Sequence, residues 1–384
     1  MGKERDNFFA SLPKRGLVYE PLQTIKIGKR LVGAGQPAYI IAEVGSNHRK
    51  DFKTALRMID IAAEAGADAV KFQHLRGTDI AADTVIYDSW HGKAIGPLSG
   101  FYETAELDYS WTGKLVAHAK KRSITFLSTP FDHKAVNVLD KAGVPAFKVA
   151  SYELTSDALL RDVARRGRPI ILSTGMATLE EVAHAVRVCQ EEGNNQIVIL
   201  HCVSIYPPRP GDFNLKAVET LRQAFKLPVG YSDHSKPPFV AVAVAAVALG
   251  ACMLEKHITD SRAGGSNDDP NSVTPEEFTR YVAEVRAAEA AMLGSGIKQP
   301  VSRVNKKTGQ HDSDEVFDRF ARRSLYAAKN MPAGHKLSQS DVCELRPFGG
   351  AEALMPADLN RALGRKLVRA IKSREALTWS HLMS

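Results

Sequence analysis

The chain has 384 residues, of which 44% are hydrophobic and 24% are charged, and its formal net charge is +8. These values are ordinary for a globular protein, and the length is enough to bury a large core. The longest apolar run, residues 240–251, is too short to cross a bilayer, and the N-terminus lacks the apolar core of a signal peptide. We therefore expect a soluble protein without a membrane segment.

The cysteines and the basic charge indicate the cellular compartment and the kind of binding partner. Cys189, Cys202, Cys252 and Cys343 are widely spaced and form no CxxC pair, which favours reduced thiols in a cytoplasmic protein. In residues 319–384, twelve Lys and Arg face five Asp and Glu. No aromatic-interleaved basic patch accompanies this excess, so an anionic small molecule or an acidic protein surface is a better partner than nucleic acid.

The chain begins with a weakly patterned arm, in which residues 24–35 are expected to form a hairpin. Eight short apolar runs follow, alternating with helical patterns such as residues 157–166, 179–192 and 275–293. Runs that are hydrophobic throughout are typical of strands buried on both faces of a parallel sheet. In chain order the runs are Ala38–Gly45, Ala69–Gln73, Ile124–Phe131, Ala146–Glu153, Pro169–Gly175, Ile197–Ser204, Pro228–His234 and Cys252–Thr259.

Eight strands joined by helices predict a closed (β/α)8, or TIM, barrel, whose reactive groups lie at the C-terminal ends of the strands. We assign the arm and hairpin to residues 1–36 and the barrel to 37–296. The polar strand-end residues indicate an enzyme, and they are Glu43, Lys71, Gln73, Thr129, Lys148, Ser151, Ser173, Ser204, Ser232, His234 and His257.

Three further segments depart from the barrel rhythm. Residues 77–108 are polar and aromatic without periodicity, and so long a loop after a barrel strand is typically a lid over the substrate. The segment 294–315 is rich in Gly, Lys, Asn and Asp, and we expect an exposed linker at residues 297–318. Residues 319–384 have short strand-like pieces with Gly and Pro turns, which predicts a small β-rich domain stabilised by docking.

At this point the motifs resemble a known family, the sialic acid synthases. The resemblance runs from about Thr24 to the C-terminus, in order and with family-like spacing. It rests on IAEVGSNH, DAVKFQ, STPFD, KVASYEL, ILSTGMAT, LHCVSIYP, GYSDHS, LEKHIT and RRSLYAAKNMPAGHKLSQSDV.

The resemblance implies an enzyme that condenses phosphoenolpyruvate (PEP) with an N-acyl mannose-type sugar. The product is a nine-carbon nonulosonic acid, such as N-acetylneuraminate, and phosphate leaves with C–O cleavage of PEP. The C-terminal segment resembles the antifreeze-like (SAF) domain, which has a β-clip fold. Members of the family are domain-swapped homodimers, in which this domain covers the partner's barrel.

Lys71 and Lys148 are the residues expected to hold the trianionic PEP. Both end barrel strands within apolar runs, and a buried ammonium group suits a phosphate or carboxylate as a point charge. The alternative is a purely structural pairing with a barrel carboxylate. Burying a lysine without a role is costly, which favours the functional reading, and the matching family lysines bind PEP.

Hydroxyl and amide groups are expected to support the same ligand. Ser151, Ser173 and Ser232 match PEP-contacting family positions, although a strand-end serine can also simply cap the next helix. Gln73 and Thr129 are expected to be similar polar supports.

His234 and His257 end the seventh and eighth strands and are therefore neighbours in a closed barrel. Two neutral imidazoles, with water and substrate oxygens, suit a divalent cation such as Mn²⁺ or Mg²⁺. Such an ion polarises the aldehyde oxygen of the sugar as a Lewis acid. His201 is expected to be structural, and His48 has no assigned role.

Glu43 and an aspartate complete the expected catalytic set. In the family the matching glutamate lies near the reacting centre, where it orients the sugar or handles a proton. Asp268 matches the acidic residue that works with the metal and the attacking water. The family usually has GPD there, whereas this chain has GSNDDP, so Asp269 is an alternative.

The sugar-contacting positions depart in part from the family pattern. Tyr206 matches a sugar contact, but Ser204 stands where many relatives have Asn. Arg346 matches the SAF-domain arginine that reaches the partner's active site and reads the N-acyl oxygen. Phe320 is a further candidate for packing on the sugar.

Three alternatives to an N-acetylneuraminate synthase remain open. One is a legionaminic or pseudaminic acid synthase that uses a diacetamido-trideoxyhexose. Another is a PEP aldol-type synthase that acts on a simple phosphosugar, which the SAF-like domain argues against. The last is a non-catalytic carbohydrate-binding or ice-binding protein, which the presence of both lysines and both histidines argues against.

Overall fold

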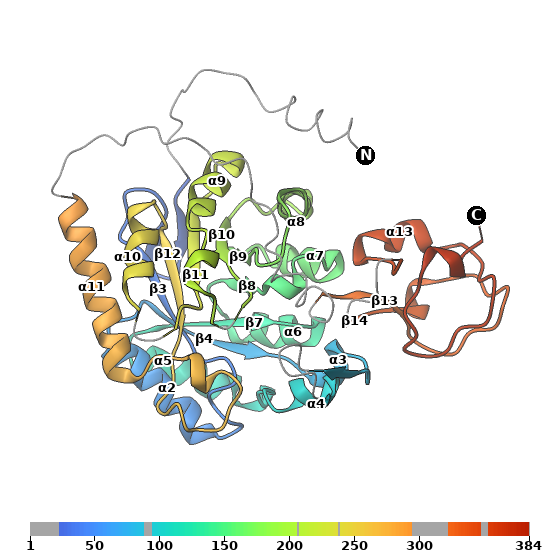
Figure 1. The fold of residues 1–384 in the computed structure, drawn as a ribbon, viewed down its shortest axis with the longest axis horizontal. Helices are drawn as coiled ribbons and strands as arrows, with labels where there is room; N and C mark the ends of the chain where they lie inside the picture. Colours follow the sequence, from blue (N-terminus) through green and yellow to red (C-terminus); the bar gives the residue numbers. More distant parts are fainter. Residues whose placement is uncertain are drawn as a thin grey trace, which may run out of the picture.

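The computed structural model describes residues 23–87, 94–205, 207–236, 239–293, 322–346 and 352–383. Within these residues, eight parallel strands close into a barrel, as the apolar runs predicted (Figure 1). The barrel runs in chain order around its circumference and closes between its last and first strands. Its strands are β3 (Tyr39–Glu43), β4 (Ala69–His74), β7 (Thr125–Pro130), β8 (Phe147–Val149), β9 (Ile170–Ser173), β10 (Ile197–Cys202), β11 (Val229–Asp233) and β12 (Met253–His257).

Helices cover the outside of the barrel, one after each strand in turn (Figure 1). Local signals set their ends: the Asp51 side chain accepts from the Thr54 N–H at the start of α2, and Thr178 and Glu181 form a capping box at the start of α8. The covering helices are α2 (Phe52–Glu64), α5 (Thr112–Lys121), α6 (His133–Ala142), α7 (Asp157–Arg165), α8 (Leu179–Glu191), α9 (Lys216–Phe225), α10 (Ala241–Ala248) and α11 (Pro275–Leu293).

Two apolar layers build the core. The larger one lies between the outward faces of the strands and the helices, and residues such as Phe72, Leu254 and Phe278 belong to it. The smaller one fills the barrel interior and includes Leu127 and Leu200. Because both strand faces are buried, the strands are hydrophobic throughout rather than at alternate positions.

A hairpin closes the floor of the barrel, at the N-terminal ends of its strands. Strands β1 (Ile25–Ile27) and β2 (Arg30–Val32) pair antiparallel, and Gly28 adopts a positive φ of 58° in their turn. Their apolar side chains join the interior core. The hairpin expected from the sequence is therefore present.

The connection between β4 and α5 is more ordered than its composition suggested. It contains α3 (Gly77–Ile80), the antiparallel strands β5 (Val85–Tyr87) and β6 (Ala94–Pro97), and α4 (Leu98–Glu103). A small core under this connection includes Ile80 and Leu98. The absence of periodicity reflects elements too short to show a repeat, because α3 is about one helical turn and β5 has three residues, which is too few for a pattern to recur.

The C-terminal domain packs beside α3 and α7 (Figure 1). It contains β13 (Ser324–Ala327), β14 (Val342–Leu345) and the short helix α13 (Leu359–Ala362), and isolated bridges join its other segments. Arginines attach it to the barrel: Arg322 pairs with Glu181, and Arg323 Nε lies 3.3 Å from Glu153 Oε1. The basic charge of this domain is thus partly used in docking.

In the described part of the chain, none of the helices has the length and apolar character that a membrane span requires.

Candidate active site

The mouth of the barrel, at the C-terminal ends of the strands, brings the predicted strand-end residues together. The strand register places Glu43 opposite both Lys71 and His257, and Ser232 opposite Glu255. The buried polar side chains of the mouth are Glu43, Lys71, Thr129, Lys148, Ser173, Ser204, Ser232, His234, Glu255 and His257.

Lys71 is the more closely paired of the two lysines. Its Nζ lies 2.7 Å from Glu43 Oε2 and 3.5 Å from Glu255 Oε1, and it donates to Thr129 Oγ1 at 3.2 Å. Gln73 Nε2 donates to Glu43 Oε1 at 2.7 Å and so orients that carboxylate. Burial alone would lower the pKa of Lys71, but Glu255 and Glu43 raise it above its ordinary value. Lys71 is therefore a fixed positive charge.

Lys148 is held less tightly. Its Nζ lies 3.8 Å from Glu255 Oε1, which is within ion-pair distance but beyond hydrogen-bond reach. Burial lowers the pKa of Lys148, and neighbouring Lys71 lowers it too, although Glu255 acts in the opposite direction. An anion bound beside Lys148 would stabilise its charged form. The mouth is thus built to receive negative charge.

Glu255 is a site residue that the sequence analysis did not single out. It lies between the two lysines and accepts from Ser232 Oγ at 3.3 Å. Burial would raise its pKa, but Lys148 and Lys71 outweigh burial and lower the pKa to about 2. The signal was present in the motif LEKH, because side chains alternate along a strand and Glu255 is two residues before His257.

Hydroxyl groups at the ends of β8, β9 and β10 line another part of the mouth. Ser173 Oγ is buried, and none of the residues that the structure describes forms a hydrogen bond with it. Ser151 Oγ accepts from the Gly175 N–H at 3.0 Å. A Cβ on Gly175 would lie 2.1 Å from Ser204 Oγ and 2.9 Å from Ser151 Oγ, so only glycine lets these hydroxyls approach each other. Such hydroxyls can donate to the oxygens of an anion.

The two histidines are neighbours, as predicted. The ring centroids of His234 and His257 are 5.5 Å apart. His234 Nδ1 lies 2.8 Å from the carbonyl oxygen of Val203, and because a carbonyl only accepts, Nδ1 carries the proton and Nε2 keeps a lone pair. Burial and His257 lower the pKa of His234 to about 3, so the ring is neutral near pH 7. Neutral imidazole is the form that binds a metal ion.

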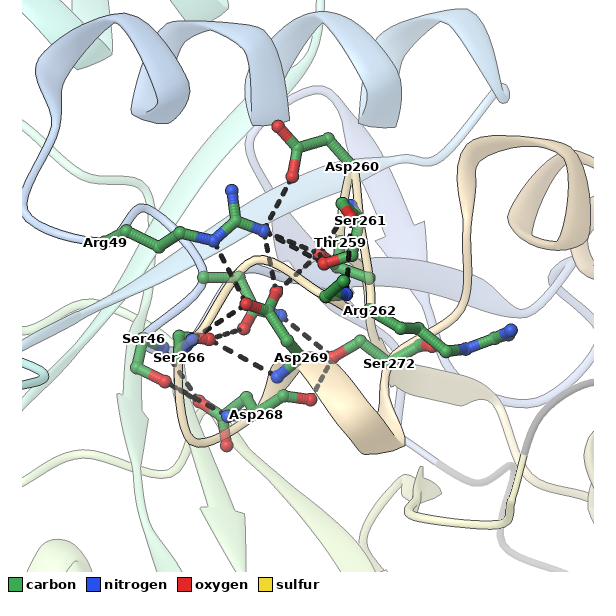
Figure 2. A network of polar contacts seen from close by, with 12 residues as sticks. Ser46, Arg49, Thr259, Asp260, Ser261, Arg262, Ser266, Asp268, Asp269 and Ser272 are labelled. Atoms are coloured by element: carbon green, nitrogen blue, oxygen red, sulfur yellow. Dashed lines mark hydrogen bonds and ion pairs between the residues drawn. The ribbon is translucent and has the colours of Figure 1, made fainter.

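The two neighbouring aspartates have different surroundings (Figure 2). Asp268 Oδ2 accepts from the N–H of Ser46 at 2.8 Å and from its hydroxyl at 2.7 Å. A Cβ on Gly45 would lie 2.4 Å from Asp268 Oδ2 and 3.3 Å from His257 Cε1, so this carboxylate is next to the histidine. Asp269 is fully buried and receives four hydrogen bonds from protein donors. The geometry favours Asp268 as the site residue.

The donor set suits a divalent cation whose remaining ligands come from substrate and water. His234 and His257 supply two imidazoles, and Asp268 lies at their side. Within the described residues, no group of three His, Cys, Asp or Glu side chains is arranged to hold an ion alone. Two imidazoles with oxygen ligands fit Mn²⁺ or a similar ion.

Arg346 is fully buried against the barrel of its own chain. Its guanidinium forms an ion pair with Glu153, and its central carbon lies 4.8 Å from the ring centroid of Tyr152, 5.0 Å from that of Tyr102 and 5.5 Å from that of Phe131. Aromatic faces attract a guanidinium without using its N–H donors, so donors remain for a ligand. Residues 294–321, which join the barrel to this domain, lie outside the described part.

The other predicted residues fall into two groups. Tyr206 and Phe320 lie outside the described residues. His201 Nε2 forms a 2.8 Å hydrogen bond with the carbonyl of Phe213, in agreement with a structural role. His48 is buried and accepts from the Lys50 N–H at 3.0 Å, and burial lowers its pKa to about 4.

Comparisons with known proteins agree with this geometry. The profile of the NeuB family matches residues 58–298, and that of the SAF domain matches residues 322–383. The chain is 36% identical to the N,N'-diacetyllegionaminic acid synthase of Campylobacter jejuni, over 82% of this chain and 92% of that one. It is 35% identical to the pseudaminic acid synthase of the same species, over 88% and 95%.

A solved structure is similar over almost the whole length. The spore coat polysaccharide biosynthesis protein SpsE of Bacillus subtilis superposes with a TM-score of 0.82 at 32% identity, covering 94% of this chain and 99% of that one. The relatives of the present chain include nonulosonic acid synthases. The chain therefore belongs to the NeuB family, as its motifs predicted, and is a PEP-dependent condensing enzyme with a C-terminal SAF domain.

Proposed function

We propose that this enzyme condenses PEP with N-acetylmannosamine or a related N-acyl amino sugar to give a nine-carbon nonulosonic acid and phosphate. The observation that carries the proposal is the pair of buried lysines that share Glu255, with Lys148 held at 3.8 Å. An anion can bind Lys148, because the ammonium group has no closer ion pair among the described residues than Glu255 at 3.8 Å. The buried hydroxyl of Ser173 can also serve such an anion.

The reaction needs the residues of the mouth in distinct roles. Lys71 and Lys148 bind the phosphate and carboxylate of PEP, while Ser151, Ser173 and Ser232 donate hydrogen bonds to its oxygens. The C3 carbon of PEP forms a bond to the aldehyde carbon of the sugar, and positive charge develops at C2. Water adds at C2, and the C–O bond to phosphate breaks.

Glu43 and Asp268 are the carboxylates that can handle protons in these steps. Glu43 is held by Lys71 and Gln73, which orients it without filling all its lone pairs. Asp268 accepts from Ser46 and lies beside His257, where it can orient the attacking water. A divalent cation bound at His234 and His257 would polarise the aldehyde oxygen as a Lewis acid.

The second candidate is a synthase for a diacetamido-trideoxyhexose. Similarity to the legionaminic and pseudaminic acid synthases supports it. Arg346 and the aromatic rings around it suit an N-acyl group of either sugar. The guanidinium can donate to the carbonyl oxygen of that group, and the rings of Tyr102 and Tyr152 can contact its methyl.

A sugar panel tests the proposal. Phosphate release from PEP would be measured with Mn²⁺ and N-acetylmannosamine, its 6-phosphate, diacetamido-trideoxyhexoses, arabinose 5-phosphate or erythrose 4-phosphate. Product mass and the fate of ¹⁸O in the C–O bridge of PEP would be recorded. Release with an N-acyl sugar and ¹⁸O in the phosphate supports the proposal. Release only with the simple phosphosugars, or with none, contradicts it.

We also propose the domain-swapped homodimer that the family resemblance implies, in which the contacts that Arg346 makes here with the barrel of its own chain form with the partner's barrel instead. Mixing two inactive variants, Lys148→Met and Arg346→Ala, under conditions of subunit exchange tests it. In a swapped dimer the intact SAF domain of one chain covers the intact barrel of the other, so about a quarter of the activity returns. If each SAF domain serves its own barrel, the mixture stays inactive.

A further inference from the structure

Beside the proposed metal site, the polar network drawn in Figure 2 joins two loops that are far apart in the sequence. We propose that Arg49 and Asp269 form a clasp, meaning this ion pair and its hydrogen bonds, that positions Asp268 at the mouth. The inference rests on the proposed function, because it assigns positioning residues to that same site. It also explains why two adjacent aspartates occur here, one to act and one to hold.

Asp269 is saturated by the protein and has no capacity left for a ligand. Its carboxylate accepts from Arg49 Nε at 3.0 Å and Nη2 at 2.8 Å, from Thr259 Oγ1 at 2.6 Å and from the Ser266 N–H at 2.9 Å. A carboxylate offers about four lone-pair positions, and all are used. Asp269 is therefore a holding group and not a ligand.

Arg49 is held in an unusual backbone conformation. Its φ is 49°, and that of the following Lys50 is 54°, a region that residues other than glycine seldom occupy. Such a conformation persists when the surroundings impose it. The guanidinium also donates to Asp260 Oδ1 at 2.7 Å and passes so close to Gly264 that a Cβ there would lie 2.0 Å from Nη2.

The clasp is continuous with the groups that hold Asp268. On the side chain, Ser46 donates twice to Asp268 Oδ2. On the backbone, Ser272 Oγ donates to the Asp268 carbonyl at 2.7 Å, and Asn47 Nδ2 in turn donates to Ser272 Oγ at 2.8 Å. Residues 46–49 and 259–272 thus meet around Asp268 from both sides. Loss of the clasp should let this loop shift relative to His257.

The experiment compares Asp269→Asn and Arg49→Lys with Asp260→Asn as the matched control. Asp260 contacts the same guanidinium, but its side chain is 32% exposed, whereas that of Asp269 is fully buried. Mn²⁺ affinity of the PEP-loaded protein would be measured by electron paramagnetic resonance, together with kcat, KM for each substrate and the thermal midpoint.

We expect Mn²⁺ affinity and kcat to fall by about 10- to 100-fold in Asp269→Asn and Arg49→Lys, as for other groups that orient a metal site. The Kd for PEP without metal should change by less than about threefold, because the lysines are not touched. Asp260→Asn should match the wild type. A lower thermal midpoint with wild-type Mn²⁺ affinity and kcat would overturn the inference, because it would show a role in stability alone.

Gly264→Ala keeps the test decisive if Asp269→Asn does not fold. It removes no charge but pushes on the guanidinium, so it should lower Mn²⁺ affinity in the same direction. Wild-type behaviour of both Gly264→Ala and Arg49→Lys would count against the clasp. If the wild type binds Mn²⁺ but no N-acyl sugar releases phosphate, the proposed function fails while the Mn²⁺ comparison still tests the clasp.

Discussion

The floor and the mouth of the barrel each contain a carboxylate shared by two cations, partly buried at the floor and buried at the mouth, but the two are held differently. At the floor, Asp68 Oδ2 accepts from Arg286 Nη2 at 2.8 Å and from the Ile40 N–H at 2.8 Å, and Arg30 pairs with the other oxygen. At the mouth, Glu255 has its contacts at 3.3–3.8 Å. Its Oε2 forms no hydrogen bond within the described residues.

This difference is what we expect between a structural ion pair and the proposed ligand site. Buried charges that are fully bonded by the protein contribute to one fold and have nothing to offer a substrate. Charged groups whose protein partners lie beyond hydrogen-bond distance can still bind a ligand. Burial strengthens their electrostatic attraction for an anion. Distances, more than residue types, therefore distinguish the two ends of the barrel.

The largest expected effect comes from Lys148→Met at the mouth. We expect kcat/KM for PEP to fall by roughly 10³-fold, because the buried cation proposed to bind PEP is lost. Burial lowers the pKa of Lys148, so the charge is costly to the fold and its removal should leave the thermal midpoint unchanged or higher. Steady-state kinetics and calorimetry measure both quantities. Lys120→Met, on the exposed surface of α5, is the control.

Strong destabilisation of Lys148→Met would show that the mouth charges support the fold, which would remove the distinction between the two ends.

The reverse pattern is expected at the floor. Asp68→Asn should reduce the free energy of unfolding by about 2 kcal/mol, because two partly exposed arginines, Arg30 and Arg286, lose the charge of a shared carboxylate. The kcat should change by less than about twofold, since the site is at the other end of the barrel. Denaturant unfolding and kinetics provide the data, and Asp60→Asn, in partly exposed pairs with His118 and Arg122, should cost below about 1 kcal/mol. A large loss of activity without destabilisation would contradict this assignment.

The smallest effect concerns acid stability on the mouth side. Burial lowers the pKa of His48 to about 4, so the unfolded chain takes up the proton first as the pH falls below about 6.5. The neutral ring is favoured by the fold, and the free energy of unfolding should therefore drop by about 1.4 kcal/mol per pH unit, or about 2 kcal/mol between pH 6.5 and 5. His48→Asn keeps an acceptor for the Lys50 N–H and should flatten this slope. An unchanged slope would exclude His48 as its source.

Much of this site could be predicted because strand ends in a closed barrel converge. Lys71, Lys148, His234 and His257 were identified from their position after apolar runs, and the register confirms that their strands bring Glu43 between Lys71 and His257. The barrel itself followed from eight such runs.

What escaped prediction depends on contacts between distant loops. Glu255 lies inside the motif LEKH, in which only the last residue, His257, was assigned a role from the sequence. The partner of Asp269 is Arg49, 220 residues earlier, and no local pattern connects them. The short elements of residues 77–108 have no periodicity to detect, and the docking of Arg346 on Glu153 joins segments 193 residues apart.

The hairpin of β1 and β2 has a consequence for the order of events. Because its apolar side chains close the floor of the barrel, reactants and products must enter and leave through the mouth. Lys71 and Lys148 lie deep in the mouth, with 2–3% of their surface exposed. A sugar bound above them would block PEP from reaching these lysines. Kinetics should then be sequential, with PEP entering first and the product having to leave before the next PEP can bind.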